Sequence, residues 1–195
     1  MTATSRHDPA QRTASATTVP ATATSTHTAP AGTAGPGTAW EIAAAVPDPE
    51  LPMLTLADLG VLSGVEEAGG TVTAWLTPTY SGCPAVAEMA ADVDARLRAA
   101  GYPEVRVRLR LDPPWSSDLI TEAGRRKLAE AGIAPPQPGP ARPGVLRLGP
   151  TRRSVHCPQC GSADTEELSR FGSTACKALW RCRSCREPFD RIKEI

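Results

Sequence analysis

The segment PAVAEMAADVDARLRAAGYPEVRVRLRL (residues 84–111) decides the fold of the first half of the chain, because its hydrophobic period changes within it. Apolar residues recur every three or four positions from Val86 to Leu97, which predicts an amphipathic helix that ends at Gly101. Apolar residues then alternate with arginines over 105–111, which predicts a strand with one solvated face. A helix followed directly by a strand indicates an α+β or α/β domain.

The flanking segments extend this pattern on both sides. Residues 38–46 predict a short helix that buries Trp40, and residues 61–79 predict a hairpin with a Gly-Gly turn. Capping residues from Ser116 predict a last helix with Leu119 buried. The order α-β-β-α-β-α predicts an α+β fold, with helices on one face of a small mixed sheet.

Composition divides the 195 residues into four parts. Residues 1–38 are almost entirely Ala, Thr, Ser, Pro and Gly and predict a disordered tail, because they bury too little apolar surface to offset chain entropy. The α+β domain is expected over 39–133. Residues 134–152 predict a stiff Pro/Gly linker, and 153–195 form a second unit with its own cysteine pattern.

The second unit contains two Cys-x-x-Cys motifs, and we expect it to be a zinc ribbon. Four thiolates on two tight turns suit a closed tetrahedral Zn²⁺ site, and a unit this small needs such a crosslink to fold. An iron site, an iron–sulfur cluster or redox disulfides are the alternatives. The expected zinc ligands are Cys157, Cys160, Cys182 and Cys185.

Two further residues of this unit, Cys176 and His156, lie outside the two motifs. Cys176 fits none of the four tetrahedral positions, so it is either a small buried apolar residue or a reactive or exchangeable ligand. His156 adjoins Cys157 and is interpreted as a neighbour of the ribbon site rather than a ligand. The slight basic excess of this unit gives little support for nucleic-acid binding.

Cys83 lies directly before Pro84, a residue preferred at the first helical position, so we expect Cys83 to be the N-cap. Backbone N–H groups and the helix dipole would lower the pKa of a thiol there and make it a better nucleophile or metal ligand. Simple packing is the alternative. Asp48 and Glu50, between prolines, predict either an exposed turn or carboxylates held beside Cys83.

The whole chain excludes several classes of function. Its 21 basic and 21 acidic residues balance, and no run is long and apolar enough to span a membrane, so neither nucleic acid nor a membrane is an expected partner. No signal peptide is evident, which predicts a cytoplasmic protein with reduced cysteines. No catalytic triad, phosphate loop or paired Glu-x-x-His motif stands out, so we expect no catalysis by this chain alone.

Three stretches together carry a resemblance to known families. VPDPELPMLTLADLGVL (46–62) and TPTYSGCPA (77–85) resemble the small domain of SufT-like iron–sulfur assembly factors. FGSTACKALWRCRSCREPFD (171–190) resembles the C-terminal ribbon of the D-subunit family of the phenylacetyl-CoA epoxidase system of phenylacetate degradation. WSSDLITEAGRRKLAEAGIAPP (115–136), between them, is similar to the same family.

The resemblance implies a non-enzymatic accessory or maturation factor for a ring 1,2-epoxidase, with a di-iron oxygenase or an iron–sulfur reductase as partner. It implies that Cys83, Asp48 and Glu50 handle iron or a transient cluster. A non-catalytic structural subunit and a thiol enzyme are the alternatives. The family resemblance also implies a cysteine next to last, where this chain has Glu194, so the role of Cys176 stays open.

Overall fold

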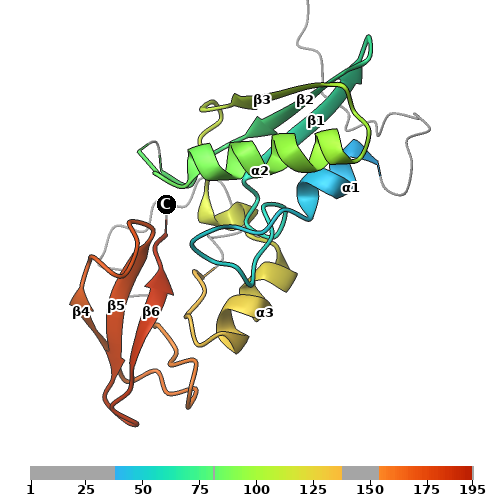
Figure 1. Ribbon diagram of the computed structural model, residues 1–195. Coiled ribbons are helices and arrows are strands. Elements are labelled where there is room, and N and C mark those ends of the chain that lie inside the picture. The colour runs from blue at the N-terminus through green and yellow to red at the C-terminus, as the bar shows by residue number, and fades with distance from the viewer. Residues whose placement is uncertain (1–37, 81, 138–153, 195) are drawn as a thin grey trace, which may run out of the picture.

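The computed structural model describes residues 38–80, 82–137 and 154–194 (Figure 1). The expected tail, apart from Thr38, and the expected linker from 138 onward lie outside the described residues. Within the described ranges, every helix is too short or too polar to cross a bilayer.

The first domain contains a three-stranded mixed sheet, as predicted. Strands β1 and β2 form an antiparallel hairpin, and β3 runs parallel to β2 on its other side. Gly69 and Gly70 form the hairpin turn with φ of +57° and +80°, values that residues with a Cβ rarely adopt. The elements are α1 (Ala39–Ala44), β1 (Leu62–Ala68), β2 (Thr71–Leu76), α2 (Val86–Ala99), β3 (Glu104–Leu109), a 3₁₀ turn (Ser117–Leu119) and α3 (Glu122–Glu130).

The core of this domain lies between the sheet and its helices, and α2 extends along one face of the sheet (Figure 1). Each buried aliphatic side chain contributes about 1.5–3 kcal/mol through its removal from water. The predicted periods are confirmed, because the buried residues on α2 are Met89, Val93 and Leu97, and those on β2 are Val72, Ala74 and Leu76.

Four residues on the predicted apolar faces are instead exposed, among them Leu111, which lies beyond the end of β3 and is 60% exposed. Trp40 is 40% exposed because α1 buries Ala39 and Ala43, not its tryptophan. Leu119 is 50% exposed because it lies in the 3₁₀ turn, before α3 begins. Leu109, at the end of β3, is 51% exposed, since the apolar alternation of that strand continues past the covered part of the sheet.

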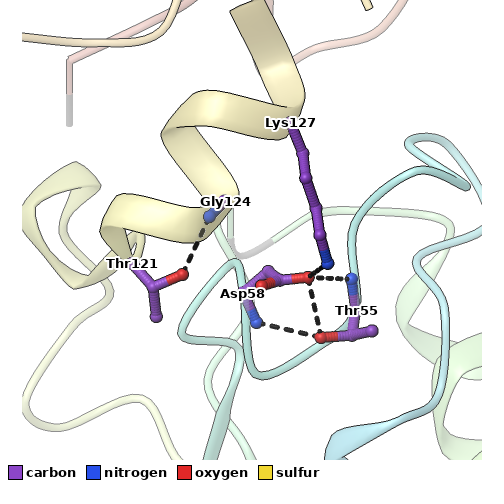
Figure 2. Close-up of polar contacts among 5 residues, drawn as sticks. All are labelled: Thr55, Asp58, Thr121, Gly124 and Lys127. Atoms are coloured by element: carbon purple, nitrogen blue, oxygen red, sulfur yellow. Dashed lines mark hydrogen bonds and ion pairs between the residues drawn. The ribbon is translucent and has the colours of Figure 1, made fainter. Parts of the chain in front are cut away.

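A polar cluster connects the loop before β1 to α3 (Figure 2). Lys127 Nζ lies 2.6 Å from Asp58 Oδ2, which also accepts hydrogen bonds from the backbone N–H and the hydroxyl of Thr55 at 3.0 Å. Thr121 caps α3 by accepting the Gly124 N–H at 2.9 Å. Burial raises the pKa of Asp58, but hydrogen bonds from Lys127 and Thr55 outweigh burial, and the net pKa lies below its ordinary value.

The second unit is an antiparallel three-stranded sheet of β4 (Thr165–Ser169), β5 (Lys177–Cys182) and β6 (Pro188–Ile192). Its core is small and includes two of the cysteines, which agrees with the predicted ribbon. The buried residues of this core are Ala134, Val155, Cys157, Cys182 and Phe189.

The two units share an interface rather than being separated by an extended linker that begins at Ala134. The Ala134 N–H donates to Asp190 O at 2.8 Å, and Ala134 O accepts the Ile192 N–H at 3.1 Å. Ile192, 3% exposed, packs into the core of the first domain, and Pro136 is fully buried. The start of the expected linker is therefore a packed segment that attaches the ribbon to the first domain.

We expect Asp58→Asn to lower the free energy of unfolding by about 1–3 kcal/mol at pH 7, because it removes the charge that Lys127 and Thr55 satisfy. The lowered pKa contributes stability above the ordinary carboxyl value of 3.8, and this contribution is lost as the pH falls through the folded-state pKa. Urea unfolding of both proteins from pH 7 down to about pH 3 should show the difference shrinking. Glu130→Gln, in an exposed 4.0 Å pair with Arg126, is the control and should change stability little. A pH-independent difference would contradict the charge-based explanation.

Candidate metal and thiol sites

The four cysteines of the two motifs meet at one end of the ribbon. Their sulfurs lie within 4.8 Å of one another, with Cys157 Sγ 3.7 Å from Cys185 Sγ and Cys160 Sγ 3.6 Å from Cys182 Sγ. Four sulfurs around a tetrahedral ion at about 2.3 Å lie about 3.8 Å apart. The spacing therefore fits a metal ion with four thiolate ligands, so this cluster could hold one.

The two turns that carry these cysteines are held by their own backbones. Gly161 N–H donates to Cys157 O at 2.8 Å, and Cys185 N–H donates to Cys182 Sγ at 3.5 Å. His156 is not part of the cluster, since its Nδ1 lies 3.2 Å from Gly161 O. The geometry of the sulfurs is thus set by local turns, which explains why sequence spacing identifies them.

A second group of sulfur and carboxylate side chains lines a cavity between the first domain and the ribbon. Asp48, Glu50 and Cys83 come from the first domain, and Cys176 comes from the ribbon. Ile192 of β6 also lines it, as do several residues of the first domain, Trp115 among them. The cavity therefore brings together residues that are distant in sequence, and one of them is Cys176, which belongs to neither Cys-x-x-Cys motif.

Asp48 is buried, 4% exposed, and its carboxylate organises the turn that follows. Asp48 Oδ1 accepts the backbone N–H of Glu50 at 2.9 Å and that of Leu51 at 2.7 Å. Burial raises the pKa of Asp48, although these hydrogen bonds and the charge of Lys177 act in the opposite direction. Asp48 is therefore not part of an exposed turn. The hydrogen bond from the backbone N–H of Glu50 to Asp48 holds Glu50 at the cavity.

The expected N-cap position of Cys83 is wrong. Helix α2 begins at Val86, and its N-cap is Ala85, so Cys83 precedes the helix and lies partly buried against the core. Burial raises the pKa of the Cys83 thiol, and the charges of Glu50 and Asp48 raise it further, which outweighs the hydrogen bond from the Ala85 N–H. The thiol is therefore held in its protonated form, not activated by the helix.

Cys176 lies in the loop before β5, where Thr174 Oγ1 is 3.1 Å from its sulfur. Burial raises the pKa of this thiol as well, and the charges of Glu50 and Asp48 also raise it. Lys177, 6% exposed and 3.7 Å from Asp190 Oδ2, supplies the buried positive charge nearby. The sequence did not predict the burial of Lys177, because nothing in its neighbouring residues distinguishes it from an exposed lysine at the start of a strand.

Two family models match separate parts of the chain. The model for an iron–sulfur cluster assembly protein matches residues 42–114, the range that contains Asp48, Glu50 and Cys83. The model for the PaaD zinc beta ribbon domain matches residues 141–193, the range that contains Cys176 and the four-cysteine cluster.

A curated relative and a solved structure are also similar to this chain. A protein of Escherichia coli (strain K12), provisionally named as the D component of 1,2-phenylacetyl-CoA epoxidase, is 44% identical over 156 residues, which cover 80% of this chain and 91% of the relative. The crystal structure of a domain of unknown function, DUF59, from Bacillus anthracis is 26% identical with a TM-score of 0.43, and the match covers 46% of this chain and 87% of that chain.

We expect the alkylation rate of Cys83 to rise with pH through a midpoint above the ordinary thiol value of 9.0, because burial and two carboxylates disfavour the thiolate. Glu50→Gln should lower that midpoint, while Glu122→Gln, at an exposed position at the start of α3, should not change it. The measurement is iodoacetamide labelling of the folded, zinc-loaded protein, with Cys83 followed by peptide mass spectrometry. A midpoint below about 8.5 would support the activated thiol that a helix N-cap produces.

Proposed function

This chain belongs to the D-subunit family of 1,2-phenylacetyl-CoA epoxidases, and from that membership we propose that it is an accessory factor that matures an iron-containing subunit of a phenylacetyl-CoA ring 1,2-epoxidase. Iron is the cargo of this process and not a resident cofactor of the chain. The factor does not itself epoxidise the substrate. Its proposed clients are the di-iron oxygenase or the iron–sulfur reductase of that system.

One observation carries this proposal. Cys83 lies with Asp48 and Glu50 at a cavity of the domain that matches an iron–sulfur cluster assembly protein. Thiolates and carboxylates both serve as protein ligands of iron, and a thiol at a cavity can pass an ion on more readily than one inside a closed site. The arrangement supports binding and transfer of iron at Cys83, with Asp48 holding the turn that presents Glu50.

The ribbon supplies a different function in this proposal. We assign Zn²⁺ to its four-cysteine cluster, in which Cys157 and Cys182 are buried in the small ribbon core. A bound Zn²⁺ ion would be structural, because four thiolates leave no open coordination position. The ribbon would then stabilise the interface with the first domain and contribute a surface to a client.

The purified protein should contain a single Zn²⁺ ion per chain without added metal, because the ribbon core is too small to hold the two turns together alone. Cys182→Ser should release that ion and unfold the ribbon strands. Metal analysis and circular dichroism would measure both effects. Folded, metal-free protein would contradict the assignment, and retained zinc in Cys182→Ser would exclude Cys182 as a ligand.

Cys83→Ser should leave the protein folded and zinc-loaded but unable to support the epoxidase, because serine preserves the volume of the thiol and removes the soft ligand. The oxygenase and reductase would be expressed with wild-type chain, with the variant or without it. We expect at least about a tenfold loss of epoxidase activity with Cys83→Ser, with a matching loss of iron from a client. Iron and labile sulfide per purified subunit would be measured alongside.

Glu122→Gln is the matched control and should behave as wild type. Full activity with Cys83→Ser would remove the maturation proposal in favour of the rival, a non-catalytic structural subunit. The rival also predicts that the chain is needed in equal amount to the oxygenase and copurifies with it, whereas a maturation factor is needed only in substoichiometric amount.

A further inference from the structure

The cavity at Cys83 is completed by the ribbon. Of the two thiols that line it, Cys83 belongs to the first domain and Cys176 to the loop before β5. The backbone of Cys176 is fixed, because its carbonyl accepts the Lys193 N–H at 2.9 Å directly beyond β6. Since β6 pairs with Ala134 and buries Ile192 in the first core, the position of Cys176 opposite the first domain is set by main-chain hydrogen bonds and packing.

The two carboxylates at the cavity differ in what they can do. Asp48 Oδ1 is occupied by two backbone N–H groups and orients the turn. Among the described residues, the side chain of Glu50 has no hydrogen-bond or ion-pair partner, although it is only partly exposed, and its charge raises the pKa of both thiols. Glu50 is therefore the carboxylate available to a ligand, and Asp48 is a positioning residue.

Cys83, Cys176 and Glu50 line one cavity, but among the described residues only the four ribbon cysteines already have their ligand atoms gathered as around an ion. We propose that Cys83, Cys176 and Glu50 close by side-chain rotation around a single divalent transition-metal ion of the Fe²⁺ type, so that the ribbon supplies a ligand that the assembly domain lacks. This inference rests on the proposed function, because the bound ion would be the iron that the factor transfers. Binding breaks two S–H bonds, releases two protons to solvent, and forms two metal–sulfur bonds and one metal–oxygen bond. The ion remains divalent throughout, so no oxidant or reductant is required.

The size of the cavity favours one ion over a cluster. Its volume is about 20 Å³, which is room for about one water-sized ligand. An iron–sulfur cluster adds several iron and sulfide atoms and would require the ribbon to move away from the first domain. Two thiolates with one carboxylate suit borderline divalent ions such as Fe²⁺, Co²⁺ or Zn²⁺, and disfavour Mg²⁺ or Ca²⁺.

The charges around the cavity also favour a cation. Asp48 and Glu50 provide two negative charges, and both thiols become negative when they bind metal, while the positive charge of Lys177 acts on Asp48 and Cys176. Burial, with the nearby carboxylates, keeps the thiols protonated, and the positive charge of an entering divalent ion opposes that effect. The surroundings are thus organised for a cation and disfavour an anionic ligand.

Anaerobic titration of the full-length, zinc-loaded protein with Co²⁺ tests the site, because Co²⁺ bound by thiolates has an intense sulfur-to-metal charge-transfer absorption. We expect one equivalent of Co²⁺ to bind and an excess of Fe²⁺ to displace it, because Fe²⁺ binds such ligands more weakly than Co²⁺, while the zinc stays with the protein. Cys83→Ser and Cys176→Ser should each weaken binding by at least about tenfold, and Glu50→Gln by about tenfold with the absorption retained. Glu122→Gln should bind as wild type.

A second measurement needs no variant and so does not depend on the folding of one. Co²⁺ should protect Cys176 as well as Cys83 of the wild-type protein from iodoacetamide. Protection of Cys83 alone, wild-type affinity in Cys176→Ser, or no Co²⁺ binding by folded protein would each overturn the shared site. Reconstitution with iron and sulfide that gives several irons per chain in this cavity would overturn the single-ion assignment.

These outcomes are separate from the test of the proposed function. If Cys176→Ser binds Co²⁺ normally while Cys83→Ser fails to mature the epoxidase, the shared site is wrong and the maturation function stands. If both thiols bind Co²⁺ but Cys83→Ser restores full epoxidase activity, the site stands and its use in maturation is wrong.

Discussion

The pairing between Ala134 and β6 determines how the rest of the molecule is organised. Two backbone hydrogen bonds, at 2.8 and 3.1 Å, join the end of the first domain to the last strand of the ribbon. The same contact directs Ile192 into the first core and leaves the loop of Cys176 opposite Cys83. A flexible connection in its place would leave two thiols on independent bodies, and no cavity between them would have a fixed shape.

Much of the fold follows from sequence period alone, because helix and strand periods each reflect one buried face. The buried positions of α2 and β2 lie where the pattern predicts them. The prediction fails at Leu109 because a period shows which face is apolar but not how far a second layer extends over it. It fails at Trp40 because the short helix α1 buries Ala39 and Ala43 instead. The packing of Ala134 and Pro136 was missed because prolines and glycines nearby indicate a linker, while burial here comes from a distant strand.

The two candidate sites also differ in how far local sequence determines them. The four-cysteine cluster is built from local turns, so the spacing of Cys157, Cys160 and their counterparts contains nearly all the information about it. The cavity depends on contacts between residues far apart in sequence, and no spacing links Cys83 to Cys176. Pro84 also misled the local interpretation, because a proline after a cysteine is typical of a helix start, yet α2 begins two residues later.

These differences suit the two sites to different tasks within one chain. In the ribbon, four thiolates can enclose an ion completely, and on the proposed assignment the fold of the unit depends on that ion, so exchange would carry the cost of unfolding. At the cavity, burial and two carboxylates raise the pKa of both thiols, so an entering ion must displace protons that are held firmly. Such an ion is bound less tightly and leaves when protons or a client's ligands compete for the sulfurs. Tight structural binding beside weaker, exchangeable binding is what a factor that carries a metal to another subunit requires.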